Sequence, residues 1–187
     1  MQFKTDPNEG ALILASVKGD GKAFEALYVR YMKAIYRYIF FRVGDENQAE
    51  DLTEEVFVRA WEALPKYQHR KHPFSSWLYR IARNLIIDYY RMKKPVPLSN
   101  GLMRSYPSSA ESLDHVVNRK HEAKLLVKAV QKLTEVEQEI VLLRFVEGLS
   151  HEEIAEMVGK SQTACRVTLH RALKSLRSTL AELEGNP

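Results

Sequence analysis

The chain has 187 residues, of which 45% are hydrophobic and 28% are charged, and its formal net charge is +4. This composition excludes a disordered chain, and the length suits one compact domain or two small ones. The lone cysteine, Cys165, excludes an internal disulfide, and the sequence has no pattern of an export signal or membrane span. We therefore expect a cytoplasmic protein without a metal or cofactor.

Helical periodicity predicts an all-α protein whose amino-terminal part holds four helices. The first spans residues 9–17, and the second is capped by Asp20 and ends before Gly44. The third spans residues 47–64 and stops at Pro65, and the fourth spans residues 74–91. The expected inward positions are Phe24, Leu27, Tyr31, Ile35, Tyr38 and Phe41 in the second helix, Leu52, Val56, Ala60 and Ala63 in the third, and Phe74, Leu78, Ile81, Leu85 and Tyr89 in the fourth.

The third and fourth helices each have a second face, besides the apolar stripe, that packing in a core does not require. On the third helix this face is acidic and contains Asp51, Glu54, Val58 and Glu62. On the fourth helix it is polar, aromatic and basic, with Trp77, Arg80, Arg83, Asn84, Asp88 and Arg91. Charged helix faces are commonly just solvated, and a tryptophan beside Leu78 also suits a core, so the residues alone leave both uses open.

The helical pattern fails over residues 93–109, which are rich in proline and serine. We therefore predict two small helical domains, residues 1–92 and 112–187, joined by a flexible linker at residues 93–111.

The carboxyl-terminal part contains the pattern of a helix-turn-helix unit. Ser150 and Glu153 have the spacing of a capping box, Gly159 suits the left-handed turn, and Ser161 can cap the next helix. In that recognition helix the inward positions are Cys165, Leu169, Ala172, Leu176 and Leu180, and the outward positions are Gln162, Thr163, Arg166, His170, Arg171 and Lys174. Because residues 160–177 contain no acid, we interpret the outward set as a surface for the DNA major groove and its phosphates. The alternative is a helical hairpin with a solvated basic face.

Four segments carry a resemblance to a known family. They are, in order, AFEALYVRYMKAIYRYI, AEDLTEEVFVRAWEAL, FSSWLYRIARNLIIDYYR and EQEIVLLRFVEGLSHEEIAEMVG. With them the chain resembles the extracytoplasmic-function (ECF, group 4) sigma factors of bacterial RNA polymerase, which belong to the sigma-70 family. The resemblance covers nearly the whole chain. It implies a region 2 helical domain, a linker and a region 4 helix-turn-helix domain, in an alternative sigma factor that is not an enzyme.

The resemblance also implies how the surfaces are used. The second face of the fourth helix would contact the melted strand of the minus-ten element, and the loop at residues 65–75 would set base preference. The outward residues of the recognition helix would contact the minus-thirty-five element of promoter DNA. The acidic face of the third helix would dock on the clamp helices of the largest polymerase subunit. The polymerase flap and an anti-sigma factor are further implied partners.

Several positions depart from the family pattern. Glu54 stands where glutamine is frequent, Thr134 follows Leu133 where proline is frequent, and Gln138 replaces an arginine. In the recognition helix, TACR replaces a frequent glycine-threonine-valine-lysine run, and Thr168 replaces an arginine. Because of these departures, the resemblance does not indicate which promoter sequence the protein recognises.

Two other functions remain open at the level of sequence. A helix-turn-helix repressor or activator with an amino-terminal sensor or dimerisation domain would explain residues 112–183 equally well, but not the second face of residues 77–91. A structural adaptor would have no salt-dependent DNA binding. His69 and His72 lie in a polar loop without further ligands nearby, which does not favour a metal site.

Overall fold

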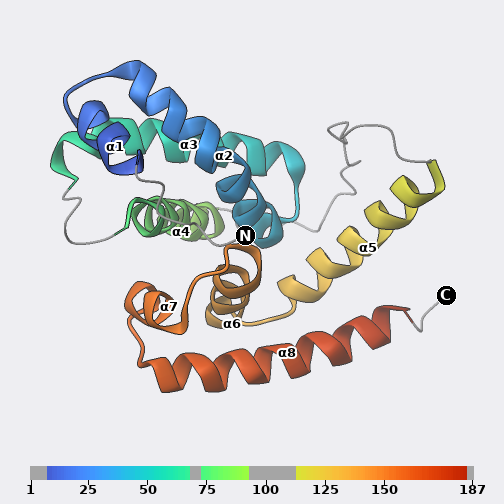
Figure 1. Ribbon diagram of the computed structural model, residues 1–187. Coiled ribbons are helices and arrows are strands. Elements are labelled where there is room, and N and C mark those ends of the chain that lie inside the picture. Colours follow the sequence, from blue (N-terminus) through green and yellow to red (C-terminus); the bar gives the residue numbers. More distant parts are fainter. Residues whose placement is uncertain (1–7, 68–72, 93–112, 185–187) are drawn as a thin grey trace.

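The computed structural model describes residues 8–67, 73–92 and 113–184, and every regular element in these ranges is a helix (Figure 1). The predicted fold class, all-α with two helical domains, is confirmed. The predicted linker, His69 and His72 lie outside the described residues, so the boundaries of the two domains stay predictions. None of the described helices is long and apolar enough to cross a membrane.

The amino-terminal helices begin and end close to the predicted residues. They are α1 (Glu9–Val17), α2 (Gly21–Val43), α3 (Glu46–Ala63), the short 3-10 helix η1 (Leu64–Lys66) and α4 (Phe74–Met92). Asp20 caps α2 as predicted, because its Oδ1 accepts hydrogen bonds from the backbone N–H groups of Lys22 and Ala23 at 2.9 and 3.2 Å. Gly44 follows the end of α2 in the left-handed conformation, with φ of 73°.

The carboxyl-terminal helices are α5 (Leu113–Gln131), α6 (Glu135–Val141), the π-helical turn η2 (Leu142–Val146), α7 (His151–Val158) and α8 (Gln162–Glu184). Two of the departures from the family pattern have local roles at the start of α6. Thr134 forms a capping box with Glu137, and Gln138 Nε2 donates a hydrogen bond to the backbone oxygen of Leu133 at 2.9 Å. These residues therefore fix the turn between α5 and α6.

Most of the predicted inward residues are buried, which confirms the direction of each apolar stripe. The exceptions are only partly buried, although they pack against the core: Phe24, Phe41, Leu52, Ala63, Ile81, Tyr89 and Leu180. On α4 the buried surface is wider than the predicted single stripe, since Trp77, Tyr79, Ala82 and Ile86 are buried as well.

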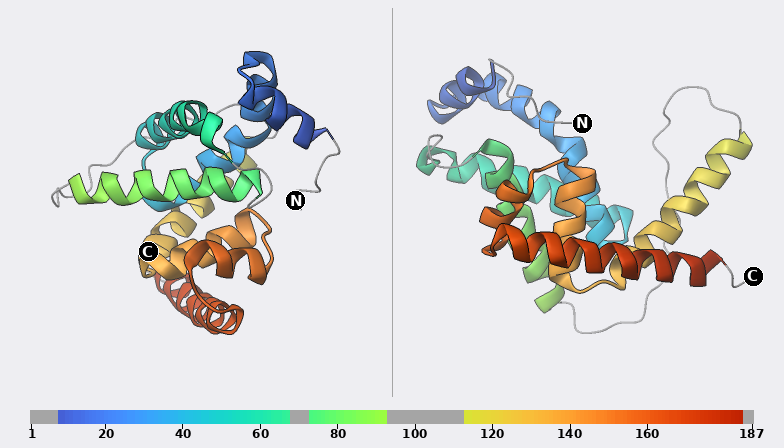
Figure 2. Two further views of the ribbon diagram at one scale, coloured as in Figure 1. Left: turned by 90° about the vertical axis from the view of Figure 1, so that its left-hand side faces the viewer. Right: turned by 60° about the horizontal axis from the view of Figure 1, so that its bottom comes forward.

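The width of this buried surface follows from the position of α4 in the molecule. The helix packs against α2 and α3 on one side and touches α7 on the other, so it lies between the amino-terminal and carboxyl-terminal helices (Figures 1 and 2). Helix α2 also contacts α5 and η2. Buried residues of both halves therefore form one continuous apolar cluster.

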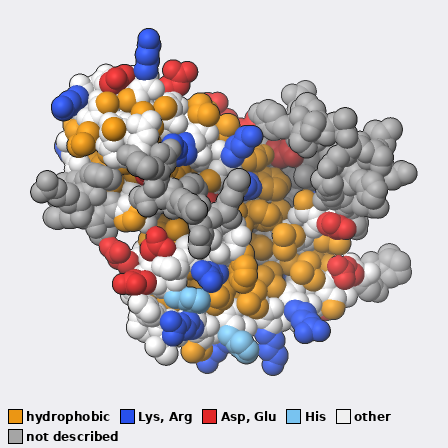
Figure 3. Space-filling model, viewed as in Figure 1, with side chains coloured by type: hydrophobic (Ala, Val, Ile, Leu, Met, Phe, Trp, Pro, Cys, Tyr) orange, Lys and Arg blue, Asp and Glu red, His pale blue; other side chains and the backbone are white. Residues whose placement is uncertain are grey.

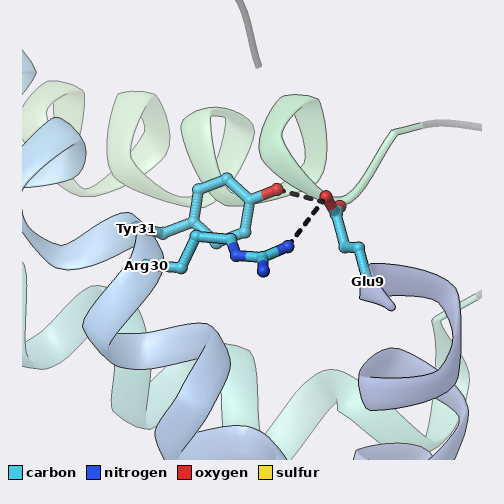
Figure 4. Close-up of polar contacts among 3 residues, drawn as sticks. All are labelled: Glu9, Arg30 and Tyr31. Carbon is cyan, nitrogen blue, oxygen red and sulfur yellow. Dashed lines mark hydrogen bonds and ion pairs between the residues drawn. The ribbon is translucent and has the colours of Figure 1, made fainter. Parts of the chain in front are cut away.

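Helix α1 is fixed to α2 by the carboxylate of Glu9. The Tyr31 hydroxyl donates a hydrogen bond to Glu9 Oε1 at 2.8 Å, and Arg30 Nη1 lies 3.6 Å from Glu9 Oε2 (Figure 4). Burial, together with the Glu9 carboxylate, raises the pKa of Tyr31. The Tyr31 ring packs on Phe74 at 5.6 Å between ring centroids, so α1 supports the aromatic residues at the amino end of α4.

We predict that Glu9→Ala lowers the free energy of unfolding by roughly 1 to 3 kcal/mol, because the buried Tyr31 hydroxyl loses its hydrogen bond to the carboxylate. The same change should cost less in a Tyr31→Phe background, where that bond is already absent. Urea unfolding of the four proteins in this cycle measures the difference. Glu25→Ala, at an exposed position of α2, is the control. Equal costs of Glu9→Ala in both backgrounds would contradict the role given to this bond.

Candidate nucleic-acid interface

Helices α7 and α8 form the helix-turn-helix unit that the sequence predicts. Ser150 Oγ accepts a hydrogen bond from the backbone N–H of Glu153 at 3.2 Å, and Glu153 Oε2 accepts one from the backbone N–H of Ser150 at 2.7 Å. Gly159 ends α7 with φ of 67°, and Ser161 Oγ accepts a hydrogen bond from the backbone N–H of Ala164 at 3.1 Å. The capping box, the turn glycine and the cap of α8 are therefore confirmed.

The outward residues of the recognition helix α8 are exposed. They are Gln162, Thr163, Arg166, His170, Arg171 and Lys174. The opposite side of α8 is anchored in the core through Cys165, Leu169, Ala172 and Leu176. Lys, Arg and His side chains line the lower edge of the molecule, over α8 (Figure 3). This basic surface has the charge that a phosphate backbone requires.

Two basic residues outside α8 lie near this surface, and the sequence analysis missed both. Arg144 in η2 donates a hydrogen bond from Nη1 to the backbone oxygen of Leu149 at 2.8 Å. Desolvation and the positive charges of Arg144 and Arg166 lower the pKa of His151, at the first position of α7. Arg144, His151 and Arg166 come from three elements, so only the folded turn brings them together.

The predicted second face of α4 is divided between solvent and the carboxyl-terminal helices. Arg80 and Asn84 are exposed. Asp88 Oδ1 and Arg91 Nη2 lie 3.0 Å apart, one helical turn from each other, so part of the charge of Arg91 is neutralised within α4.

Arg83 is paired across the two halves of the chain. Its Nε donates a hydrogen bond to Glu139 Oε2 of α6 at 2.8 Å, and the Glu139 side chain is 4% exposed. This bond to Glu139 raises the pKa of Arg83. A residue predicted to neutralise a DNA phosphate is therefore neutralised by a carboxylate of its own chain.

Trp77 lies in an aromatic cluster at the amino end of α4. Its ring centroid lies 4.7 Å from that of Tyr67 and 5.4 Å from that of Phe74, and its exposed fraction is 9%. Burial, followed by the Glu9 carboxylate, raises the pKa of Tyr67 to about 12. Trp77 is thus buried in this arrangement, and its use as a stacking surface for a base stays a prediction. The loop that would set base preference spans residues 65–75, and its residues 68–72 lie outside the described residues.

A cavity of about 170 Å³ lies where α4 faces the carboxyl-terminal helices. Helix α4 contributes Ser76, Trp77, Arg80, Arg83 and Asn84 to its lining. The other half contributes Glu139 of α6 and Glu156 and Met157 of α7. Four of the six residues predicted for the melted strand therefore meet in one hollow, and the three opposing residues were not foreseen. No local signal could have found them, because they are 55 or more positions away in the chain.

The acidic face of α3 is exposed as a whole. Asp51, Glu54, Val58 and Glu62 all reach solvent, and the exposed fraction of Val58 is 52%. The only nearby basic residue of α3, Arg59, pairs with Glu55 of the same helix at 2.6 Å. Trp61, which the sequence analysis did not select, is 40% exposed beside this face and packs against Phe24 at 4.9 Å between ring centroids. The surface is therefore acidic and partly apolar.

Comparison with known families matches both halves of the chain. Residues 27–95 match the family described as Sigma-70 region 2, which here includes α3 and α4. Residues 123–176 match the family described as Sigma-70, region 4, which here includes α7 and most of α8.

Two curated relatives and one solved structure are similar over most of the chain. The chain is 34% identical over 172 residues to the ECF RNA polymerase sigma factor BldN of Streptomyces coelicolor, and the match covers 91% of this chain and 65% of BldN. It is 31% identical over 176 residues to the ECF RNA polymerase sigma factor SigW of Bacillus subtilis, and the match covers 89% of this chain and 93% of SigW. The structure of CnrH in complex with the cytosolic domain of CnrY has a similar fold, with a TM-score of 0.72, 24% identity, and coverage of 97% of this chain and 100% of that chain.

Proposed function

We propose, because the chain belongs to the extracytoplasmic-function class of the sigma-70 family, that it binds RNA polymerase core and directs promoter-specific initiation of transcription. The observation that carries the proposal is the placement of two surfaces suited to DNA in the two matched regions. One is the exposed basic face of α8, and the other is the arginine and amide face of α4. A repressor needs only the first of these surfaces.

In the proposed function, α8 reads the minus-thirty-five element as double-stranded DNA. The side chains that extend from it toward solvent include amide, hydroxyl, imidazole and guanidinium groups, which can bond to base edges and phosphates. Arg166 is placed one turn into the helix, opposite the buried Cys165 and Leu169. A long cationic side chain there reaches a groove without disturbing the core.

Helix α4 holds the melted strand of the minus-ten element. Asn84 can donate to and accept from a base edge, and Arg80 can neutralise a phosphate. Arg83 and Arg91 can do the same when a phosphate replaces their carboxylate partners, Glu139 and Asp88. Trp77 gives a flat apolar surface for a base if the carboxyl-terminal helices move away. Stacking of a base on an aromatic ring contributes roughly 1 to 3 kcal/mol, which is comparable with the cost of unstacking one base.

The acidic face of α3 binds polymerase core. A basic and partly apolar surface, such as the clamp helices, complements the three carboxylates and Val58. The flap and an anti-sigma factor are further proposed partners.

The protein acts in the cytoplasm and has no enzymatic activity of its own. Its two domains span residues 1–92 and 112–187, and a linker at residues 93–111 connects them.

Reconstituted transcription tests the proposed function. Added to polymerase core, the monomeric protein should start RNA synthesis at a subset of genomic promoters, whereas core alone should not. The opposite outcome is that no genomic promoter gives a product and that the isolated protein binds a palindromic operator as a dimer. That outcome would replace the proposal by a helix-turn-helix repressor.

The acidic face of α3 gives the next prediction. Asp51→Arg combined with Glu54→Arg should weaken binding to core by roughly tenfold at low salt, because two attractive contacts become repulsive. Glu25→Arg combined with Glu182→Arg changes the net charge equally at exposed positions of α2 and α8 and should leave the affinity unchanged. Binding of labelled protein to core across a salt series measures both. If the two double variants behave alike, the acidic face is merely solvated.

The two DNA surfaces should act at different steps. Arg166→Ala should weaken formation of the closed promoter complex. If Arg166 contacts a base, the binding free energy should fall by about 1 to 3 kcal/mol. If it contacts only phosphate, the affinity should fall by a similar amount for every promoter sequence. Asn84→Ala should leave that step nearly intact and impair strand opening. Its defect should shrink on a template that is already melted, because the cost of unstacking has been removed.

Filter binding of closed complexes and permanganate footprinting of unpaired thymines separate the two steps. The assignment of Asn84 to the melted strand is wrong if Asn84→Ala reduces closed-complex binding as much as Arg166→Ala does. It is equally wrong if neither change affects transcription.

A further inference from the structure

The outward face of the recognition helix α8 contains an apolar side chain that the sequence analysis did not select. Val167 is the sixth residue of α8 and is 46% exposed. It is two residues away from Cys165 and from Leu169, which are both buried. Successive residues of a helix are about 100° apart around its axis. Val167 therefore lies on the side of α8 that is opposite to the core.

The residues around Val167 belong to the surface that we assign to DNA. Thr163 precedes Val167 by one helical turn, and His170 and Arg171 follow it by one turn, so the four side chains are neighbours on the helix. These three polar neighbours are exposed, whereas α6 and α7 pack on the other side of α8 (Figures 1 and 2). Val167 is thus surrounded by side chains that suit a DNA groove.

A comparison with Leu173 shows why the position of Val167 matters. Leu173 is 39% exposed, but it is four residues from Leu169 and three from Leu176, so it borders the buried stripe and belongs to the margin of the core. Single exposed apolar residues are common on protein surfaces, so exposure alone indicates no role. Valine is also a weaker helix former than alanine. Neither core packing nor helix propensity therefore accounts for a valine at position 167.

We propose that Val167 reads the methyl group of a thymine in the minus-thirty-five element. The inference rests on the proposed function, in which α8 binds that element in the major groove, and it adds the base that one side chain selects. In the major groove, thymine is the only one of the four bases that presents a methyl group. A valine side chain can pack against this group, and it can neither donate nor accept a hydrogen bond. Its chemistry therefore matches thymine and no other base.

Two physical effects favour thymine opposite Val167. Contact with the methyl group removes apolar surface of both partners from water. A donor or acceptor of another base in the same place would lose water without gaining a hydrogen bond, which costs free energy. Burial of one methyl group changes an affinity by about fourfold. Val167 should therefore refine the base preference, while the basic neighbours supply affinity through phosphates.

The first test identifies the thymine by selection. Polymerase core with the parent protein is mixed with duplexes in which the minus-thirty-five element of an active promoter is randomised, and closed complexes are isolated and sequenced. Val167→Ala should relax a preference for thymine at one position and leave the other positions unchanged. Alanine favours the helix, so unfolding would not explain this result. Equal relaxation at all positions, or relaxation at none, would overturn the proposal.

The second test removes only the methyl group from the DNA. Deoxyuridine pairs with adenine as thymine does but lacks this group. At the selected position it should weaken the closed complex of the parent protein by about fourfold. Val167→Ala should bind the thymine and deoxyuridine templates equally, because its contact with the methyl group is already lost. A parent protein that selects thymine but does not distinguish deoxyuridine would read DNA shape instead, and the proposal would be wrong.

A matched control separates this contact from a general effect of losing an exposed valine. Val29 of α2 is 66% exposed, and Val29→Ala removes the same atoms far from α8 in the chain. This variant should keep the parent's ratio of affinities for the thymine and deoxyuridine templates. A ratio that falls as much in Val29→Ala as in Val167→Ala would contradict the role of Val167.

The proposed function and the thymine contact fail in different assays. A holoenzyme that starts transcription but binds thymine and deoxyuridine templates equally would overturn the contact and leave the function intact. A protein that starts transcription with core at no genomic promoter would overturn the function, and with it the inference that rests on it.

Discussion

The side chain of Tyr79 joins the two halves of the chain, as does the ion pair between Arg83 and Glu139. Its ring lies in the apolar core that α2 and α4 share, and its hydroxyl bonds to Glu147 at the end of η2. An aromatic residue can serve both purposes because one end is apolar and the other is a hydrogen-bond donor. Helix α4 is consequently buried on two sides, whereas Arg80 and Asn84 of its second face are exposed.

This double burial places charged groups as well as apolar residues between the two halves. The apolar part of the interface favours association of the halves, whereas the partly satisfied charges at Arg42, Glu139 and Glu147 oppose it.

Local features of the chain were predicted well because their causes are local. The caps at Asp20, Ser150 and Ser161 and the left-handed Gly159 depend on residues within four positions of each other. Helical period alone also identified the exposed residues of α8 and of the acidic face of α3, since each helix has only one core to face. Thr134 was interpreted as a departure from a family pattern, although with Glu137 it has the spacing of a capping box.

The sequence by itself determined the all-α class, the positions of the amino-terminal helices, the helix-turn-helix unit and the family, because periodicity, capping and motif order are properties of neighbouring residues in the chain. Only the tertiary structure decided that Trp77 is covered and that Arg83 has an internal carboxylate as its partner. The physical reason is that Arg83 and Glu139 are 56 residues apart, and no periodicity along one helix reports a partner on another. Burial of α4 from a second side likewise depends on how the two halves pack, which the pattern within each half does not encode.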